Sequence, residues 1–326
     1  MDSALMLTLG HHASAIWFNP EDGIPLGYEE ERLNRIKSTS AYPRMALDRI
    51  ESLATIVPGS YVFVSHWFDK LDFYKESNKY FDKEHFDSLV AKYDLRPVFL
   101  SDNFTHHDAH AWSGVSFWRA NVTNEHLARI APDDKLHVIV ADGYGTNQEV
   151  ISIYEMNKQN RPELVKRYHG YNYSLGLMYQ YATSFVGMKE NQDEYKFLGY
   201  ETHIHSVLDS ASVAAVERWA HEQAERMFDV MLRNSDSRGV NWQNPGGLVN
   251  YAHLSNAKEM WSSIFGDVLS RVNIKRDDRA ARIVIGHYVH ELIERVMLRI
   301  TEENNMKHVI LAGGIFYNVK LNNSIL

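Results

Sequence analysis

Three histidines and an aspartate lie close together in one short stretch of the chain, NFTHHDAHAWSG. His106 and His110 are four residues apart, so on a helix both imidazole rings project from the same face. Two neutral imidazoles at this spacing suit a divalent metal ion. His107 points away from that face and does not join them. The alternative is a polar patch on an ordinary helix, in a chain that has 17 histidines.

A metal ion held by His106 and His110 would need a third ligand. The chain contains no cysteine, so the ligand must be another histidine or a carboxylate. Asp142 is the candidate, because it follows a strand-like run in VADGYGT and its neighbours Gly143 and Gly145 leave room for a metal or a phosphate. Asp-Gly is also a common hairpin turn, and the motif alone does not decide between the two.

Two further glycine turns are candidates for anion binding. In LGHHASA, Gly10 and the small residues around it let backbone N–H groups approach an anion, although an ordinary tight turn has the same composition. In LAGGIFYN, a strand runs into Gly313 and Gly314 and then into a helix, which is a nucleotide-cradling arrangement. We expect Asn318 one turn into that helix, within reach of a base or ribose.

Two charged segments could supply a cation for an anionic ligand. The run EEERLNRIKST has mixed charge, which is typical of a solvated face, and its functional interpretation places Arg35 or Lys37 over the ligand. The segment SLGLMYQYAT reads as an amphipathic helix, and DEYKFLGY as the loop after it. The functional interpretation there places Lys196 near a phosphate.

The elements that must position these residues follow from the hydrophobic pattern of the chain. In the first part we expect a hairpin, two more strands and two helices. We expect the helix over His106–Arg119 to bury Ala109, Trp112, Ser113, Val115 and Phe117. The expected strands are Ala4–Leu9, Ala13–Phe18, Tyr61–Trp67 and a run near residue 98, and the expected helices are Pro43–Leu53 and His106–Arg119.

The clearest hairpin of the chain comes next, over Lys135–Met156. Its strands, Leu136–Ala141 and Val150–Tyr154, flank the turn Asp142–Thr146. Helical patterns follow over 212–234 and 277–302, and the chain ends in a strand, the Gly-Gly turn and a helix.

Two strand–turn features recur, one at Gly10 and one at Asp142. The recurrence predicts two related α/β lobes that face a shared cleft, with a hinge near residues 125–136. We therefore divide the chain into a first lobe, 1–135, and a second lobe, 136–326.

Composition restricts the class of protein. The chain has 326 residues, 44% of them hydrophobic and 23% charged, which suits a globular protein with two domains. A net charge of −8 argues against a protein built to grip nucleic acid. The N-terminus does not read as a signal peptide, and no apolar run approaches the roughly 20 residues that span a bilayer. We expect a cytoplasmic protein without a membrane partner.

The motifs occur in a particular order: GHHASA, EERLNRIKS, HHDAHAWS, DGYGT, SLGLMYQYAT, EYKFLG and LAGGIFYN. In this order the chain resembles the O-carbamoyltransferase family that acts in nodulation-factor and antibiotic biosynthesis. The N-terminal region of that family is similar to the universal tRNA threonylcarbamoyl transferase subunit. The resemblance implies a fold of the actin/Hsp70/sugar-kinase class, in which two ribonuclease-H-like lobes enclose a nucleotide.

The resemblance also implies an activity. In this family carbamoyl phosphate and ATP form a carbamoyl-adenylate, and the carbamoyl group then passes to a substrate hydroxyl beside a metal ion. His106, His110 and Asp142 would hold that ion, iron or a similar divalent metal, with zinc and manganese as alternatives. His11 and Lys37 would lie near the carbamoyl or phosphate groups as catalytic residues. The residues expected to bind the nucleotide are Gly10, Gly143, Gly145, Lys196, Gly313, Gly314 and Asn318.

The chain departs from the family in two places. Members of the family read EYKVMGLAPYG where this chain reads EYKFLGYETHI, so the loop that contacts the nucleotide or acceptor is expected to differ. The family continues beyond the Gly-Gly helix to a further metal-binding aspartate and to a second domain that makes the adenylate, whereas this sequence stops at Leu326. We expect a fragment, a split enzyme that needs a separate adenylate-forming partner, or a degenerate relative.

Other functions stay open on the sequence alone. The related branch transfers threonylcarbamoyl groups to tRNA, but the acidic charge and the EERLNRIK and SLGL elements favour a small-molecule acceptor. A non-catalytic nucleotide-binding subunit and a sugar or acetate kinase of the same fold class are the remaining alternatives. The 18 tyrosines and 7 tryptophans would suit stacking on a sugar-like or nucleoside-like acceptor.

Overall fold

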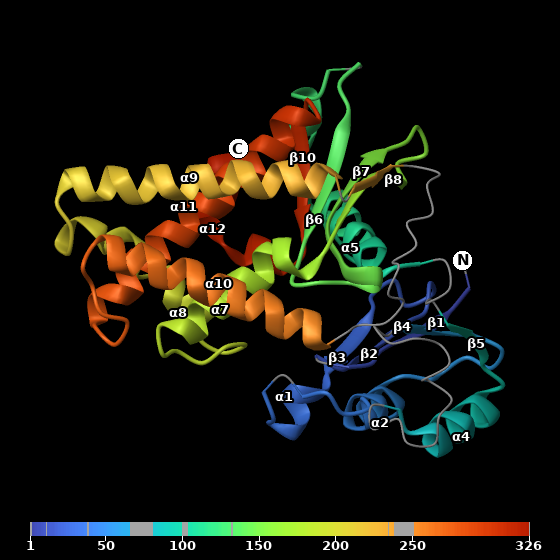
Figure 1. Cartoon of the computed structure of the whole chain (residues 1–326). Helices are drawn as coiled ribbons and strands as arrows, with labels where there is room; N and C mark the ends of the chain where they lie inside the picture. The colour runs from blue at the N-terminus through green and yellow to red at the C-terminus, as the bar shows by residue number, and fades with distance from the viewer. Residues whose placement is uncertain are drawn as a thin grey trace. The chain divides into compact units, whose positions relative to one another are not determined.

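The computed structural model describes residues 2–10, 12–37, 39–65, 81–99, 104–131, 133–233, 235–237 and 251–325. The chain divides into two compact units, Met1–His106 and His107–Leu326 (Figure 1). The division falls at the first residue of helix α5 (His106–Asn121), so this helix groups with the second unit. The sequence-based division had assigned the same helix to the first lobe.

The first unit contains a five-stranded sheet with the strand order β3-β2-β1-β4-β5. Strands β1, β2 and β3 form an antiparallel meander, and β4 and β5 continue the sheet in parallel to β1. The predicted opening hairpin is therefore correct. The strands are β1 (Ala4–Thr8), β2 (Ser14–Phe18), β3 (Leu26–Glu29), β4 (Tyr61–Ser65) and β5 (Arg96–Phe99).

Three helices belong to the first unit, α1 (Glu30–Asn34), α2 (Arg44–Leu53) and α4 (Lys83–Tyr93). Alternate residues of β1 and β4 and one face of α2 share a single buried core, as the two-residue period of strands and the turn of the helix require. The buried carboxylate of Glu30 accepts hydrogen bonds from the backbone N–H groups of Met45 (3.2 Å) and Ala46 (2.9 Å). Pro43 at the N-cap of α2 has no side chain that could accept from the free N–H groups of the first turn. Glu30 takes over this capping role.

The second unit contains another five-stranded sheet, in the order β10-β6-β7-β8-β9. Its strands β6, β7 and β8 form an antiparallel meander, and β10 lies parallel to β6. The same arrangement occurs in the first unit, where β4 lies parallel to β1. The strands are β6 (Leu136–Ala141), β7 (Glu149–Met156), β8 (Pro162–His169), β9 (Ser235–Ser237) and β10 (His308–Ala312).

The repeated strand arrangement is the one expected for two ribonuclease-H-like lobes, and it confirms the predicted α/β fold class. The hairpin over Lys135–Met156 is also confirmed, with β6 and β7 as its strands.

Strand β6 separates two hydrophobic cores of the second unit. Val138 and Val140 pack with Ala111 and Val115 of α5 on one face of the strand. The alternate residues Ile139 and Ala141 belong to the core on the other face. A Cβ atom on Gly114 would lie 3.2 Å from side-chain atoms of Ile310 and of Ala312, so α5 lies close against β10 as well. The sheet therefore fixes the height and rotation of α5.

The predicted buried face of α5 was only partly right. The buried residues are His107, Ala111 and Val115, which are spaced four residues apart and therefore lie on one face of the helix. Phe117 is 73% exposed, although it was expected inside. Because α5 contacts the sheet along one narrow stripe, the apolar side chains beside that stripe stay at least partly exposed.

The other face of the second sheet is covered by long helices (Figure 1). The helices predicted over 212–234 and 277–302 are confirmed as α9 and α11. The helices of this layer are α7 (Leu175–Phe185), α9 (Ser210–Arg233), α10 (Tyr251–Arg271) and α11 (Arg279–Glu303).

Short elements complete the second unit. They are the helices α6 (Asn124–Ala128), α8 (Glu194–Leu198) and α12 (Val319–Ile325) and the 3-10 helices η2 (Thr146–Gln148), η3 (Tyr171–Tyr173), η4 (Glu201–Ser206) and η5 (Gly314–Tyr317). In the described part of the chain, no helix combines the length and the apolar character needed to cross a bilayer.

Candidate metal centre

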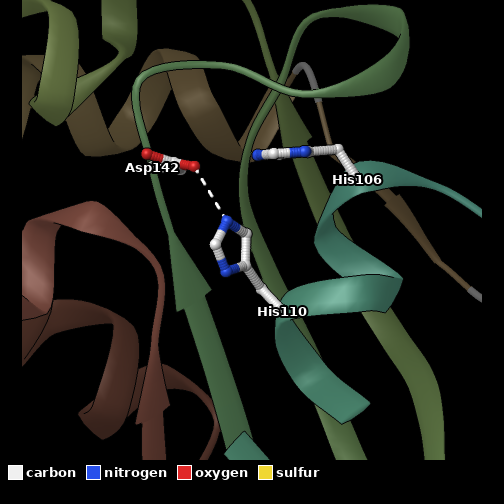
Figure 2. A group of neighbouring side chains, drawn as sticks. All are labelled: His106, His110 and Asp142. Atoms are coloured by element: carbon white, nitrogen blue, oxygen red, sulfur yellow. Dashed lines mark hydrogen bonds and ion pairs between the residues drawn. The ribbon is translucent and has the colours of Figure 1, made fainter. Parts of the chain in front are cut away.

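Three potential metal ligands converge at one end of the second sheet (Figure 2). His106 and His110 lie on the first turns of α5, and Asp142 follows the last residue of β6. The Nε2 atom of His110 lies 3.1 Å from Oδ2 of Asp142. One possible ligand atom on each of the three side chains lies within 4.8 Å of those on the other two. The structure thus brings together the three residues that the sequence singled out.

Asp142 is held by the backbone around it. Its amide donates to the carbonyl of Val150 across the hairpin (3.2 Å), and its Oδ1 atom accepts a hydrogen bond from the amide of Gly143 (2.8 Å). The second oxygen, Oδ2, faces His110. The carboxylate is therefore oriented before any ligand arrives.

The Gly-Gly turn after β10 lies against the same aspartate. Gly313 has φ +97°, and a Cβ atom there would lie 2.4 Å from the carbonyl oxygen of Ala141. A Cβ atom on Gly314 would lie 2.9 Å from Oδ1 of Asp142. Only glycine fits at Gly313, because both the backbone angle and the space exclude a side chain. The predicted glycine turns at Asp142 and at Gly313 are neighbours in space.

The three ligands fit a catalytic divalent metal ion. Two imidazoles and one carboxylate leave coordination positions open for water or substrate, and this set suits iron(II) and zinc. The side chains of His110 and Asp142 are 33% and 24% exposed, so small molecules can reach them. The donor set and the access both favour a reactive metal centre over a closed structural one.

The start of α5 is anchored by a buried glutamate on β7. Glu149 is fully buried, and its Oε1 atom accepts hydrogen bonds from the backbone amides of His107 (3.0 Å) and Thr146 (3.1 Å). A carboxylate at this position satisfies free N–H groups of the helix and interacts favourably with the positive end of its dipole. Glu149 thereby ties the helix that carries both histidines to the turn that carries Asp142.

Arg167 on β8 compensates the charge of Glu149. Its Nε atom lies 2.9 Å from Oε2 of Glu149, and its Nη2 atom lies 3.0 Å from Oδ1 of Asp108. The hydroxyl of Tyr154 donates to the same Asp108 oxygen at 2.6 Å. Burial opposes the charge of Arg167, but Glu149, Tyr154 and Asp108 raise its pKa. The guanidinium therefore stays charged and links α5 to β7 and β8.

His107 points away from His106 and His110, as predicted, and its burial in the interior was not predicted. Its side chain is fully buried, and Nδ1 lies 2.8 Å from the hydroxyl oxygen of Ser152. Tyr154 lies two residues further along the same strand. Burial, followed by the charge of Asp108, raises its pKa, so its hydroxyl stays protonated and remains a donor.

Sequence reasoning missed this supporting network. Asp108 lies in the motif NFTHHDAHAWSG, but the sequence assigns it no role. Glu149 is recognisable in the sequence only as a charged residue at the start of an apolar strand. Ser152, Tyr154 and Arg167 gave no recognisable signal. Their contacts join residues up to 59 positions apart, and no local pattern predicts such pairs.

The start of α7 lies against the Asp142–Gly143 turn. Ser174 caps this helix by accepting a hydrogen bond from the amide of Leu177 (3.0 Å), and its hydroxyl donates to the carbonyl of Gly143. A Cβ atom on Gly176 would lie 2.7 Å from the amide nitrogen of Gly143. The positive end of α7 is thus brought next to the glycine turn, which favours anion binding there.

Gly145, the second glycine of the hairpin turn, is restricted by the side chains of Glu149 and His107. A Cβ atom on Gly145 would lie 2.6 Å from Oε1 of Glu149 and 3.0 Å from the ring of His107. Gly145 therefore leaves room for the buried anchor of α5. At Gly143 a Cβ atom would meet nothing within 4 Å.

Asn318 does not lie one turn into the last helix, as the sequence had suggested. It stands before α12, and its side-chain oxygen accepts hydrogen bonds from the amides of Lys320 and Leu321, both at 3.1 Å. Its amide nitrogen lies 3.4 Å from Nδ1 of His290. Asn318 is therefore the cap of α12, and its contact with a nucleotide stays a prediction.

Lys196 on α8 is paired with the residue that precedes this short helix. Its ammonium lies 2.6 Å from Oδ1 of Asp193, and this hydrogen bond raises the pKa of Lys196. Its contact with a phosphate stays a prediction.

Gly10 and Lys37 belong to the first unit. Gly10 follows β1 with φ +100°, and Lys37 is exposed after α1. His11 lies outside the described residues. The roles of these three residues also stay predictions.

A hollow of about 230 Å³ lies beside η3 of the second unit. The ring of Tyr144, between the two glycines of the hairpin turn, meets the ring of Tyr171 edge-on with 5.2 Å between centroids. Tyr171 in turn lines the hollow, so an aromatic contact connects the hollow to the turn. The lining residues are Gln148, Gly170, Tyr171, Asn172, Tyr173 and Asn256.

Two solved structures resemble this chain weakly. One is the activator of the 2-hydroxyisocaproyl-CoA dehydratase from Clostridium difficile with bound ADPNP, with 12% identity, a TM-score of 0.38 and coverage of 99% of this chain and 84% of that one. The other is a glucokinase from an Antarctic psychrotroph, with 9% identity, a TM-score of 0.31 and coverage of 100% and 99%. No curated protein matches the chain.

A family model gives a match over most of the chain. The model describes the carbamoyltransferase N-terminus, and it matches residues 77–326. The matched region includes α5 with its two histidines, the Asp142 hairpin and the Gly-Gly turn after β10. The chain belongs to the carbamoyltransferase family, whose N-terminal part it matches.

Proposed function

We propose that the protein transfers a carbamoyl group from carbamoyl-adenylate to a hydroxyl group of a small molecule, with the help of a divalent metal ion. The observation that carries the proposal is the convergence of His106, His110 and Asp142 beside two glycine turns. A carbamoyl transferase needs a group that polarises the carbonyl and a place for the anionic leaving group, and this corner of the second unit offers candidates for both.

His106, His110 and Asp142 are proposed to hold the metal. The bound ion, iron(II) in our proposal with zinc or manganese as alternatives, would act as a Lewis acid toward the carbamoyl carbonyl or the acceptor hydroxyl. The protein would set the position of the ion in advance, because Glu149 and Arg167 hold α5 while the amide of Gly143 orients Asp142.

The glycine turns are proposed to hold the adenylate phosphate. The Gly-Gly turn at Gly313 and the capped start of α7 at Ser174 approach Asp142 and Gly143 from two sides. Backbone N–H groups and the positive end of α7 suit a phosphate and would stabilise AMP as it leaves. Gly10, Lys196 and Asn318 are retained as further nucleotide contacts.

The proposed step is balanced by one proton transfer. The acceptor oxygen forms a bond to the carbamoyl carbon, the bond from that carbon to the phosphate oxygen breaks, and AMP leaves with the electron pair. The hydroxyl proton passes to a base. His11 and Lys37 are proposed, from the family resemblance, to act beside the carbamoyl and phosphate groups.

The hollow beside η3 is proposed to receive the acceptor. Its volume of about 230 Å³ is somewhat below that of typical ligand pockets, which suits one sugar-like or nucleoside-like unit. Tyr173, which is partly exposed, offers an aromatic surface, while Asn172 and Asn256 offer hydrogen bonds to hydroxyl groups. The carbamoyl-adenylate is proposed to come from carbamoyl phosphate and ATP on a separate domain or partner, in the cytoplasm.

The test supplies carbamoyl-adenylate directly, so that no partner is needed. The protein is mixed with panels of sugars and nucleosides, and mass spectrometry detects the carbamoylated product while AMP release is followed. We expect product only with a hydroxyl acceptor and only in the metal-loaded protein.

Other outcomes of the same experiment would overturn the proposal. Product formation on tRNA alone would favour the threonylcarbamoyl branch, and ATP hydrolysis driven by the acceptor alone would favour a kinase. Nucleotide binding without turnover, even after addition of an adenylate-forming partner, would favour a non-catalytic subunit.

A further inference from the structure

A second group of potential metal ligands lies between the helices α9 and α11, which are both in the second unit. Glu217 and His221 are four residues apart on α9, and His287 and Glu291 are four residues apart on α11. Each pair therefore projects from one face of its helix. Nε2 of His287 lies 3.3 Å from Oε1 of Glu217, and Nε2 of His221 lies 3.2 Å from Oε2 of Glu291.

The spacing of these groups is close to that of a coordination shell. One possible ligand atom on each of Glu217, His287 and Glu291 lies within 4.8 Å of those on the other two. Tetrahedral ligands at about 2.1 Å from a zinc ion lie roughly 3.4 Å apart. Small side-chain rotations would thus bring the three onto one ion, and His221, already in contact with Glu291, is placed to become the fourth ligand.

The next turn of the same two helices shows what an ordinary ion pair between them looks like. Glu225 on α9 lies 2.7 Å from Arg295 and 3.3 Å from Arg299 on α11. In the described part of the chain, Glu217 and Glu291 have only histidines within ion-pair distance. No lysine or arginine of the described residues thus lies at ion-pair distance from these two carboxylates, and a divalent cation would supply positive charge between them.

His287 has a carboxylate behind it. Its Nδ1 atom lies 3.9 Å from Oε2 of Glu201, an ion-pair distance that is too long for a hydrogen bond, and Glu201 is itself paired with Lys320. Metal-binding histidines usually direct their second ring nitrogen toward such a carboxylate, which fixes the tautomer and the ring orientation. Nε2 donates to Oε1 of Glu217 at 3.3 Å, so an ion that binds on that side would displace the Nε2 proton.

The site has one closed and one open side. The side chain of His287 is only 9% exposed, whereas those of Glu217 and His221 are 39% and 49% exposed. Both of these line a surface hollow of about 440 Å³. An ion could therefore enter from solvent and bind against a buried histidine.

We propose that Glu217, His221, His287 and Glu291 bind a divalent transition-metal ion such as Zn²⁺, which clamps α9 to α11. Two imidazoles and two carboxylates form a complete tetrahedral set, as in a structural site. This site is separate from His106, His110 and Asp142, and it does not depend on the proposed carbamoyl transfer.

The test uses Zn²⁺ with the full chain in an H106A/H110A background, which removes the candidate metal centre. Equilibrium dialysis and metal analysis then count the zinc ions that remain. We expect one ion per chain in this background and none after the further changes Glu217→Gln and His221→Ala. The matched control carries Glu222→Gln and His205→Ala, which are exposed and outside the cluster, and it should keep the ion.

Two further readouts make the outcome decisive. Zinc should raise the melting temperature of the H106A/H110A protein and of the control, but not of the E217Q/H221A variant, whose melting curve in chelator should match that of its parent. Glu201→Gln should weaken zinc binding roughly 10–100-fold. The absence of zinc from the H106A/H110A protein, or full zinc retention in E217Q/H221A, would overturn the second site and leave the carbamoyl-transfer proposal untouched.

Discussion

Gly176 and Gly313 allow three segments of the second unit to meet around Asp142. At each of them a Cβ atom would collide with backbone, with the amide of Gly143 in one case and the carbonyl of Ala141 in the other. Backbone cannot move aside as the end of a flexible side chain can. Single glycines thus determine how closely α7 and the turn after β10 approach the candidate metal ligand.

Gly176→Ala should therefore displace the Asp142–Gly143 turn. We expect a loss of about 1–3 kcal/mol of stability from overpacking and a further loss of metal affinity at the candidate centre. The matched control is Gly266→Ala in the middle of α10, where a Cβ atom meets nothing within 4 Å and alanine should add up to about 1 kcal/mol. Urea unfolding and metal titration measure both effects, and equal stability of the two variants would contradict the account.

At the scale of elements, α5 is held by charges as well as by its apolar stripe. The stripe at His107, Ala111 and Val115 sets its rotation, and Glu149 holds its first turn. Arg167 lies 2.9 Å from Glu149 and supplies its counter-charge inside the unit. The position of His106 and His110 thus depends on residues outside the proposed ligand set.

Arg167→Met should leave the carboxylate of Glu149 buried without its counter-charge. Breaking a buried pair in this way costs about 3–5 kcal/mol. On the surface of the same sheet, Lys135→Met breaks the pair of Lys135 with Glu155 and should cost less than about 1 kcal/mol. Chemical denaturation measures the free energy of unfolding of both variants. If Arg167→Met lowers it no more than Lys135→Met does, Arg167 does not anchor α5 through Glu149.

Strand β6 carries a buried histidine that should make stability depend on pH. His137 is 5% exposed, and its Nδ1 atom has no hydrogen-bond partner in the described structure. Burial lowers the pKa of His137, with Glu155 and Lys135 as the nearby charges. Between the lowered pKa and about 6.5 the unfolded chain binds the proton and the folded chain does not, so stability is present above about 6.5 and falls as the pH falls.

His137→Gln should flatten this part of the pH profile. The wild-type protein should lose at most about 1.4 kcal/mol per pH unit through this group as the pH falls from about 6.5. The same change at the exposed His203 serves as control and should leave the profile as it is. Urea unfolding at several pH values between about 5 and 8 measures the slope, and an unchanged slope in the His137 variant would refute the assignment.

At the scale of the whole chain, much of the fold could be predicted because its signals are local. The runs of β6 and β7 and the Asp-Gly turn between them predicted the hairpin, and the repeat of such a feature predicted two related lobes. The four-residue spacing of His106 and His110 predicted a shared helix face, and the structure brings that face to Asp142.

What could not be predicted depends on contacts between distant segments. The boundary between the units depends on which sheet α5 packs against, and Phe117 is exposed because α5 presents only a narrow stripe to that sheet. The pairing of Arg167 with Glu149 and Asp108, and of α9 with α11, joins residues with no local pattern in common. Asn318 reads as a residue inside a helix until its role as a cap is seen.

We propose that His106, His110 and Asp142 hold the metal ion that carbamoyl transfer requires. The most direct measurement combines metal analysis and acceptor-dependent AMP release from carbamoyl-adenylate on the same samples, in the E217Q/H221A background. We expect about one iron or zinc ion per chain and measurable transfer in this background. Adding Asp142→Ala should abolish both, and adding His205→Ala should change neither. Equal metal content and equal transfer with and without Asp142→Ala would contradict the account.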